Sequence, residues 1–305
     1  MTIKLEERNQ TRNIDCADFA AEEGKTLLLA SRDCKQAGTA VDIGGIKLGL
    51  SEVVVMAGPC SVESPEQILR IAREVKQAGA TILRGGAFKP RTSPYDFQGL
   101  GKAGLEYLRA ASSETGLRVV TEIVDPRDVE MVCEYADCLQ IGSRNMQNYA
   151  LLREVGRSSM PVLLKRGMSA SYREFLLAAE YVMAEGNDQV VLCERGIISL
   201  SKELRFTLDL NAVPYLKGKT HLPVIVDPSH GTGSAPLVAA MSRAAIACGA
   251  DGLILETHYS PEDSISDAAQ TISTGEFAPL MKSLATVANA VGRTMAFASA
   301  PIALR

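Results

Sequence analysis

Eight short apolar segments alternate with stretches of helical periodicity along most of the chain, and this alternation limits the fold more than any other feature. The segments cover residues 53–57, 81–84, 118–122, 138–142, 161–165, 190–194, 222–227 and 252–256, and most are rich in Val, Ile and Leu. Apolar runs without polar alternation are typical of parallel strands buried on both faces. The pattern therefore predicts eight successive βα units.

The intervening stretches have the spacing of amphipathic helices. In residues 65–75, Ile68, Ile71, Ala72 and Val75 share one face, and Pro65 suits the first helical position. Residues 169–184, 237–248 and 277–290 show the same periodicity. We therefore expect an α/β protein whose helices cover a parallel sheet.

One (β/α)8 TIM barrel accounts for eight evenly spaced units without a break in composition. A doubly wound open sheet is the alternative, but no GxGxxG follows the first strand and eight units would make a wide sheet. Residues 1–45 do not fit the repeat, so we predict an N-terminal extension (1–45) and a catalytic barrel domain (46–305). The extension has two open roles: covering one barrel end, or contributing to a subunit contact.

Charge and cysteine content exclude several classes of protein. The net charge is −4, with 32 basic and 36 acidic residues, so we expect neither a nucleic-acid partner nor an anionic membrane surface. No apolar run reaches the roughly 18 residues of a membrane span, and the charged N-terminus does not resemble a signal peptide. Seven cysteines without a CxxC pair favour reduced thiols and a cytoplasmic location.

Polar residues follow every predicted strand, at the barrel end where chemistry occurs in this fold. One group is cationic, although the chain is acidic overall, and consists of Arg84, Lys89, Arg91, Arg144, Lys165 and Arg195. Arg recognises phosphate and carboxylate through its planar fork, and Lys recognises them as a point charge. The group therefore predicts a site for at least two anionic groups.

A second group offers the ligands of a divalent transition metal: Cys60, His230, Glu256 and a less certain member, Asp267. Each has a structural alternative. Cys60 suits a buried thiol, and His230 suits a hydrogen-bonded residue in a Pro-Ser turn. For Asp267 the default interpretation is a helix cap, so the residues alone leave its role open.

Six motifs resemble the DAHP synthases (3-deoxy-D-arabino-heptulosonate-7-phosphate synthases), in their short type I-beta branch. The motifs are Gly-Pro-Cys-Ser at 58, Lys-Pro-Arg-Thr-Ser at 89, Ile-Gly-Ser-Arg-Asn-Met-Gln-Asn at 141, Leu-Lys-Arg-Gly at 164, Cys-Glu-Arg-Gly at 193 and Asp-Pro-Ser-His at 227. They occur in the family's order, and the resemblance covers about residues 27–285. Such a set is highly specific, and it implies a barrel enzyme that condenses phosphoenolpyruvate with erythrose 4-phosphate in the shikimate pathway or a specialised version of it.

The resemblance also implies roles for individual residues. Cys60, His230, Glu256 and Asp267 match the metal ligands, with Mn2+ expected first and Fe2+, Co2+ or Zn2+ as alternatives. Arg144 and Arg195 match the residues that bind the phosphate of phosphoenolpyruvate. Lys165, Lys89 and Arg84 match residues near its carboxylate and reacting centre. Glu122 matches an acid that orders water. Arg91, Thr92 and Ser93 match the phosphate site of a phosphorylated aldose. Lys89 is expected to be the acid for the forming alkoxide, and a dimeric or tetrameric homo-oligomer is expected.

The chain departs from the branch pattern in the loops after the sixth and seventh strands. Ile198 and Ser199 replace an Arg-Thr pair, Phe206 replaces an Asn, and Ser234 and Ala235 replace two basic residues. Ser143 replaces an Ala, which is a minor change. The loops become less basic, so the acceptor is the open question. The alternatives are the same chemistry on another aldose phosphate, a metal-dependent sugar-phosphate aldolase or isomerase, a Schiff-base aldolase using Lys165, and a non-catalytic sugar-phosphate sensor.

Overall fold

Eight parallel strands form the centre of the computed structural model, which describes residues 27–201 and 203–296. The strands are β3 (Glu52–Gly58), β4 (Ile82–Arg84), β5 (Arg118–Ile123), β6 (Cys138–Ile141), β7 (Val162–Lys165), β8 (Val190–Glu194), β9 (Val224–Val226) and β10 (Gly252–His258). Each pairs in parallel with the next, and β10 pairs with β3, so the sheet closes. The closed barrel confirms the predicted fold, and every predicted apolar segment overlaps one of these strands.

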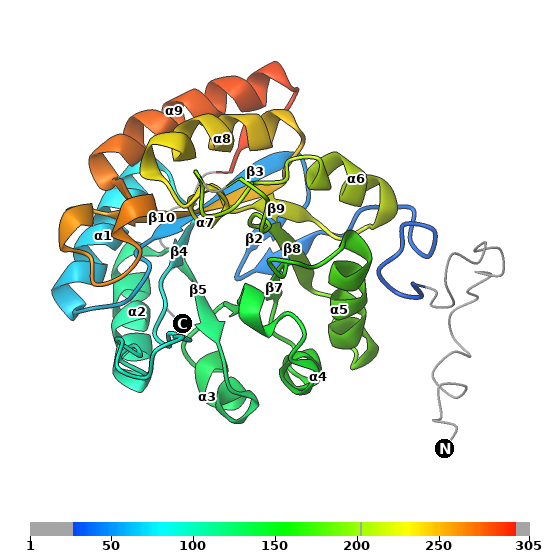
Figure 1. Ribbon diagram of the computed structural model, residues 1–305, viewed down its shortest axis with the longest axis horizontal. Coiled ribbons are helices and arrows are strands. Elements are labelled where there is room, and N and C mark those ends of the chain that lie inside the picture. The colour runs from blue at the N-terminus through cyan, green and yellow to red at the C-terminus, as the bar shows by residue number, and fades with distance from the viewer. Residues whose placement is uncertain (1–26, 202, 297–305) are drawn as a thin grey trace.

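Helices surround the barrel, and Figure 1 looks along it. They are α1 (Pro65–Ala78), α2 (Lys102–Thr115), α3 (Val129–Cys133), α4 (Tyr149–Arg157), α5 (Tyr172–Ala184), α6 (Ala212–Lys219), α8 (Ala235–Ala247) and α9 (Thr274–Ala290), with the single-turn α7 (Pro228–Thr232) after β9. In α1, Ser64 caps the first turn by accepting from the Gln67 amide, and Gly79 ends the helix at φ 104°. Its apolar face, including Ile68 and Val75, is buried against the strands.

A small antiparallel hairpin, β1 (Val41–Ile43) and β2 (Ile46–Leu48), closes the end of the barrel at which the strands begin. Val41, Ile43 and Leu48 are buried in one cluster with barrel-interior side chains such as Val54 and Met56. The division expected at residue 45 falls in the turn of this hairpin, and residues 1–26 of the expected extension lie outside the described residues. One end of the barrel is therefore filled by apolar side chains.

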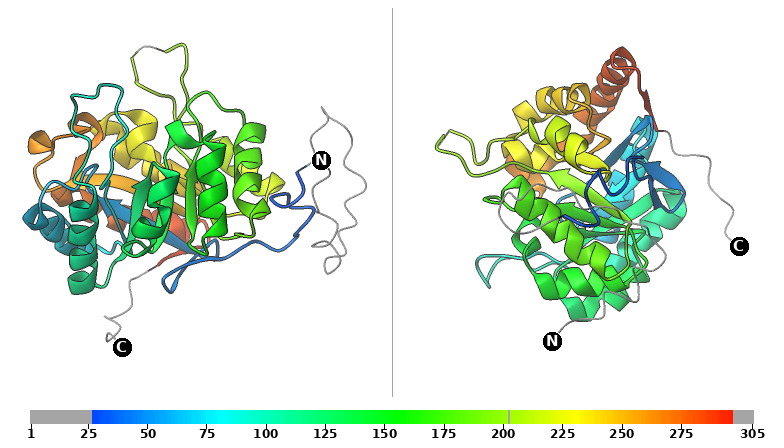
Figure 2. Two further views of the ribbon diagram at one scale, coloured as in Figure 1. Left: turned by 90° about the horizontal axis from the view of Figure 1, so that it is seen from below. Right: turned by 90° about the vertical axis from the view of Figure 1, so that its right-hand side faces the viewer.

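The opposite end carries the long loops. Figure 2 shows the loop after β4 (residues 85–101) and the described parts of the loop after β8 (residues 195–201 and 203–211) extending from the end of the barrel away from the hairpin. Two short strands, β11 (Ile272–Ser273) and β12 (Thr294–Met295), lengthen the pairing along β10 and β3. Within the described ranges, no helix has both the length and the apolar character that crossing a bilayer requires.

Candidate active site

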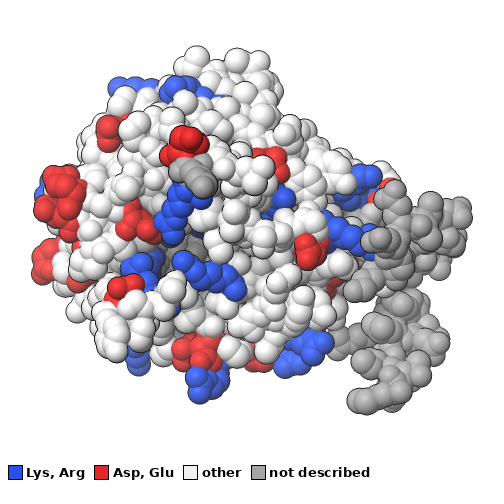
Figure 3. Space-filling view, in the orientation of Figure 1, with Lys and Arg blue, Asp and Glu red and all other residues white. Residues whose placement is uncertain are grey.

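A pocket lies at the carboxyl ends of the barrel strands, where basic side chains gather around a hollow in the surface (Figure 3). Its lining residues are Arg84, Lys89, Pro90, Arg91, Glu122, Gln140, Gly142, Ser143, Arg144, Lys165, Met168, Arg195, Arg205, His230 and Asp267. All six cations predicted from the sequence are among them. The pocket therefore combines strong positive charge with a smaller acidic group.

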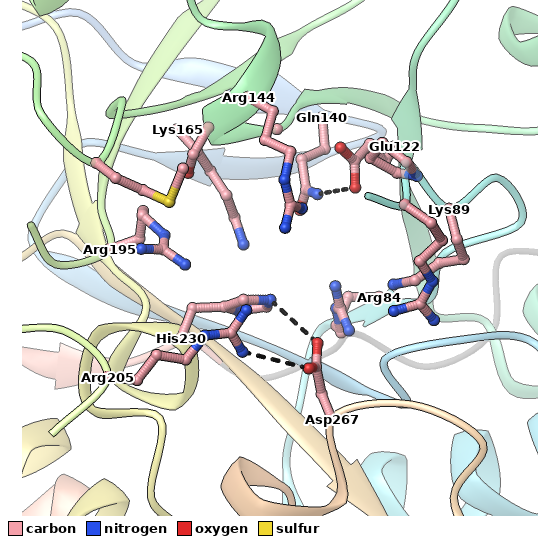
Figure 4. Close-up of a pocket in the computed structure, with 15 residues that line it drawn as sticks. Arg84, Lys89, Glu122, Gln140, Arg144, Lys165, Arg195, Arg205, His230 and Asp267 are labelled. Carbon is pink, nitrogen blue, oxygen red and sulfur yellow. Dashed lines mark hydrogen bonds and ion pairs between the residues drawn. The ribbon is translucent and has the colours of Figure 1, made fainter. Parts of the chain in front are cut away.

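These cations come from several units of the barrel, and the five that Figure 4 labels point into the pocket: Arg84, Lys89, Arg144, Lys165 and Arg195. Arg84 and Lys165 end β4 and β7, Arg195 follows β8, and Arg144 lies in the turn after β6. Thr92 and Ser93 do not line the pocket: Thr92 is exposed, and the Ser93 hydroxyl accepts from the Tyr95 amide at 3.2 Å. The structure thus brings together the cations, but not the whole expected aldose-phosphate motif.

Cys60, Glu256 and Asp267 converge beside the cations, with one donor atom of each within 4.8 Å of the others. The Cys60 Sγ is 3.2 Å from the Asp267 Oδ2 and 3.0 Å from the Lys89 Nζ. The His230 Nε2 is 3.4 Å from the Glu256 Oε1 and 4.0 Å from the Asp267 Oδ2. The four expected metal ligands therefore surround one small volume, with the imidazole at its edge.

The chemistry of this group fits a divalent transition metal. Burial, reinforced by the Glu256 carboxylate, raises the pKa of the Cys60 thiol to about 11. A thiolate at this position therefore needs a cation close by. One soft thiolate, one imidazole and two carboxylates form a mixed donor set of the kind that binds Mn, Fe, Co or Zn better than Mg.

Asp267 directs its side chain into the site instead of capping the turn that follows it. Its backbone is left-handed (φ 57°, ψ 30°), and it is the one non-glycine residue in the described ranges with a positive φ. Its side chain makes no capping hydrogen bond to the following turn, so the default interpretation as a helix cap is wrong. The carboxylate turns into the pocket, toward Cys60 and Arg205.

Asp227 joins the cationic and the metal-ligand groups, a role that sequence reasoning missed. It is 1% exposed and accepts from the Lys165 Nζ at 2.5 Å, and the same Oδ2 lies 2.8 Å from the His230 Nδ1. Burial alone would raise the pKa of Asp227, but the charges of His230 and Lys165 hold it well below its usual range. One buried carboxylate therefore contacts both side chains.

Arg84 is a second buried link between the cationic and the metal-ligand groups. Its Nη1 donates to the Pro59 carbonyl at 2.7 Å and to the Glu256 Oε1 at 3.0 Å. The other carboxylate oxygen of Glu256 accepts from the Gln270 amide at 2.7 Å. Although burial alone would raise the pKa of Glu256, His230 and Arg84 keep it below its usual value. Glu256 is thus held ionised and oriented.

Glu122 borders the pocket between two strands. Its Oε2 accepts from the Gln140 amide at 3.3 Å, as drawn in Figure 4. A Cβ placed on Gly142 would lie only 2.0 Å from the Glu122 Oε1, so the carboxylate occupies space that the glycine leaves free. The glycine after β6 therefore allows this acid its position.

A buried ionic network holds the strand ends that carry Lys165 and Arg195. The neighbouring Arg166 donates to the Glu194 Oε2 at 2.8 Å and to the Asp209 Oδ2 at 3.0 Å. The Gly196 amide donates to the other Glu194 oxygen at 2.6 Å. Lys165 precedes Arg166 and Arg195 follows Glu194, so each of these two cations adjoins a residue of the network in sequence.

Most of the residues that depart from the sequence pattern of the type I-beta branch do not line the pocket. Ile198 is 63% exposed, and neither Ser234 nor Ala235 is among the lining residues, whereas Ser143 is. Phe206 is different: its ring lies 4.1 Å from the guanidinium carbon of Arg195. Arg205, which sequence reasoning missed, lies in the same irregular loop and pairs with the Asp267 Oδ1 at 3.5 Å.

Comparison with known proteins places this geometry in a family. Residues 33–291 match the family described as DAHP synthetase I. The chain is 46% identical over 280 residues to phospho-2-dehydro-3-deoxyheptonate aldolase of Thermotoga maritima, covering 92% of this chain and 83% of that protein. It is 31% identical over 257 residues to 2-dehydro-3-deoxyphosphooctonate aldolase of Syntrophotalea carbinolica, covering 78% and 92%.

A solved structure gives the same result. The crystal structure of the Thermotoga maritima DAHP synthase is similar with a TM-score of 0.86 at 47% identity, covering 88% of this chain and 78% of that chain. The sequence motifs and the barrel thus agree with the comparisons. The chain belongs to the DAHP synthetase I family.

Proposed function

We propose that this protein is a DAHP synthase, which condenses phosphoenolpyruvate with erythrose 4-phosphate to give DAHP and phosphate. The single observation that carries the proposal is the meeting of a cationic pocket with a thiol, imidazole and carboxylate donor group at one end of the barrel. Both substrates are anionic and repel one another in solution. A pocket lined by cations offsets that repulsion and can hold both reactants in one geometry.

Phosphoenolpyruvate takes the inner part of the pocket. Arg144 and Arg195 bind its phosphate, and Lys165 and Arg84 lie on the side of its carboxylate. Lys165 and Arg84 are both nearly inaccessible and are held by carboxylates, which supports fixed positions rather than mobile surface charges. Charge-assisted hydrogen bonds of this kind contribute roughly 1.5–3 kcal/mol each.

Carbon–carbon bond formation joins the methylene carbon of phosphoenolpyruvate to the aldehyde carbon of the aldose. Lys89 protonates the oxygen that becomes an alkoxide, since its ammonium points to the donor group and lies 3.0 Å from the Cys60 Sγ. Water then adds to C2, ordered by the Glu122 carboxylate, and the carbon–oxygen bond to phosphate breaks. No covalent bond to the enzyme is needed.

Cys60, His230, Glu256 and Asp267 would hold the divalent metal, with Mn2+ proposed first. A bound divalent ion supplies Lewis-acid polarisation of the aldehyde oxygen. The residues of the chain orient this chemistry: Asp227 fixes the imidazole of His230, and Gln270 with Arg84 fixes Glu256. Supporting contacts of this kind usually matter for metal affinity.

A Schiff-base aldolase is a weaker alternative. Its nucleophile would be Lys165, but the Nζ of this residue is buried against the Asp227 Oδ2 at 2.5 Å and is not free to attack a carbonyl. An aldolase or isomerase acting on one sugar phosphate would not need a second anion site. Release of inorganic phosphate from phosphoenolpyruvate, dependent on an added aldose, separates the proposal from all these alternatives and from a non-catalytic sensor.

Erythrose 4-phosphate is the proposed acceptor because Lys89 and Arg91 line the pocket, while the exposed Ile198 and the pair at 234 and 235 lie outside it. The test measures phosphoenolpyruvate consumption and phosphate release with erythrose 4-phosphate, ribose 5-phosphate, arabinose 5-phosphate and an unphosphorylated aldose. We expect the highest kcat/KM with erythrose 4-phosphate and little turnover of the unphosphorylated sugar. Preference for the unphosphorylated sugar would contradict the acceptor assignment, and Arg144→Ala is the low-activity control.

We also propose a cytoplasmic homo-oligomer. Five of the described cysteines, Cys60, Cys133, Cys138, Cys193 and Cys248, carry thiols outside any disulfide, which suits a reducing compartment. The loop after β8 exposes Ile198, Leu200 and Leu204, apolar area that suits a subunit contact. Light scattering on the purified protein tests the assembly directly.

A further inference from the structure

Phe206 lies at the base of the loop after β8, beside a pocket cation. Backbone hydrogen bonds in both directions between Ile197 and Thr207, at 3.0 and 2.9 Å, close this loop. Phe206 is 7% exposed, and its Cβ would be 3.1 Å from a Cβ placed on Gly196. Its side chain is therefore packed against the segment that carries Arg195.

The ring meets two guanidinium groups. The guanidinium carbon of Arg195 lies 4.1 Å from the ring centroid, and that of Arg205 lies 5.2 Å from it. A guanidinium close to an aromatic face is attracted by the ring electrons, most strongly where water is excluded. Arg195 is 5% exposed, so its contact with the ring is of the desolvated kind.

Beside this contact, the hydrogen-bond donors of Arg195 are largely unused by the described residues. A guanidinium has five N–H donors. Within residues 27–201 and 203–296, the side chain of Arg195 donates to the Gly196 carbonyl at 3.4 Å, a long bond. Figure 4 shows the group directed toward the pocket centre, so its donor edge stays available to an anion.

We propose that Phe206 is a positioning residue for the phosphate of phosphoenolpyruvate: its ring holds the Arg195 guanidinium against the pocket wall with the donor edge turned inward. An amide at this position, expected from the family pattern, has no such face and can form hydrogen bonds of its own. The identity of the anion rests on the proposed function. The role of the ring can be measured by anion binding alone.

Two variants of the full chain, loaded with Mn2+, distinguish the effect of the aromatic face from the effect of the apolar volume of the side chain. Phe206→Leu keeps an apolar side chain and removes the aromatic face, and Phe206→Tyr keeps the face. We expect Phe206→Leu to weaken phosphoenolpyruvate binding in calorimetry about tenfold, the size of a partly desolvated cation–π contact. We expect its kcat at saturating phosphoenolpyruvate to change less than about twofold, because the contact serves binding rather than the reacting bonds. Phe206→Tyr should bind phosphoenolpyruvate nearly as tightly as the wild type.

Two controls test the route through Arg195. In an Arg195→Ala background, Phe206→Leu should have little further effect, because the partner of the ring is gone. Leu208→Ala is the matched packing control, since Leu208 is a buried apolar residue of the same loop, 8% exposed. It should lower the unfolding temperature at least as much as Phe206→Leu while leaving phosphoenolpyruvate affinity close to wild type.

Three results would overturn the inference. These are equal loss of affinity in Phe206→Leu and Leu208→Ala, an undiminished effect of Phe206→Leu without Arg195, or wild-type affinity in Phe206→Leu. If the wild type binds phosphoenolpyruvate but releases no phosphate with any aldose, the proposed function fails and the binding data still decide on Phe206. If phosphoenolpyruvate does not bind, the same series of variants measured with inorganic phosphate decides on the role of Phe206. If neither phosphoenolpyruvate nor inorganic phosphate binds, both proposals are overturned.

Discussion

Replacing Gly142 with alanine should impair catalysis without impairing folding, because the glycine is needed by a neighbouring side chain rather than by its own backbone. Gly142 has φ −67° and ψ 158°, an extended conformation open to any residue. The added methyl group would lie 2.0 Å from the Glu122 Oε1 and 2.9 Å from its Cδ. The carboxylate must therefore move, while the surrounding barrel need not.

The size of the effect follows from this distance. A carbon–oxygen contact is comfortable at about 3.3 Å, so the carboxylate oxygen has to move by roughly 1.3 Å from the 2.0 Å position. A displacement of about 1 Å at a reacting centre can cost on the order of 100-fold in rate. The backbone itself should become more stable by about 0.4–1 kcal/mol, because alanine restricts the unfolded chain more than glycine does.

The assay combines kcat/KM for phosphate release with denaturant unfolding of Gly142→Ala, Glu122→Ala and the double variant. We expect both single variants to lose activity strongly and the double variant to lose no more than Glu122→Ala. Full activity of Gly142→Ala would refute the argument about space. An additive loss in the double variant would show that the methyl group acts on something other than Glu122.

Three further predictions concern the metal ligands, the Asp227 carboxylate and the Tyr172 phenol. Chelation should abolish activity and Mn2+ should restore it, and full activity in metal-free protein would contradict a role for the metal. Competition titrations of Cys60→Ser should show weaker binding of Zn2+ and Co2+ with Mn2+ less affected, since the thiolate is the soft ligand. Asp227→Asn should cost about 3–5 kcal/mol of unfolding free energy and most of the activity, because it leaves a buried lysine unpaired. Asp251→Asn weakens the ion pairs of a buried carboxylate with Lys217 and Arg293 at the other barrel end, so it should destabilise the protein but spare kcat. Burial and a hydrogen bond to Asp209 raise the pKa of Tyr172 from 10.0 to about 12. The neutral phenol should therefore stabilise the fold fully below pH 10, and this stabilisation should be lost as the pH rises toward 12. The difference in unfolding free energy between the wild type and Tyr172→Phe should shrink over that range, and a constant difference would contradict the prediction.

The barrel could be predicted because its strands have a simple physical signature. Parallel strands covered on both faces need continuous apolar runs, and this chain contains eight at regular intervals. Helix starts were less predictable: α9 begins at Thr274, after a capping box formed by Ser273 and Glu276, whereas the apolar periodicity begins only at residue 277. Periodicity records the buried face of a helix and not its polar first turn.

Residues at strand ends could be assigned to the site for the same reason, since carboxyl ends of barrel strands meet. Arg205 and Phe206 could not, because they lie in a long irregular loop without periodicity, where only the folded chain shows what faces the pocket. Asp227 was visible in a motif, but its contact with Lys165 joins β7 to the segment after β9 and depends on how the barrel closes. Contacts across the barrel interior leave no local pattern in the sequence.

The left-handed backbone at Asp267 has a consequence for redesign of the metal preference. Only Gly, Asn and Asp adopt this conformation at low cost, and other side chains carry roughly 1–2 kcal/mol of strain. A His, Cys or Glu introduced at this position to attract another ion would begin with that penalty before any bond to the ion forms. Asn is the one substitution that retains both an oxygen donor and the backbone. Engineering toward softer or harder cations therefore has more freedom at the other three donors than at residue 267.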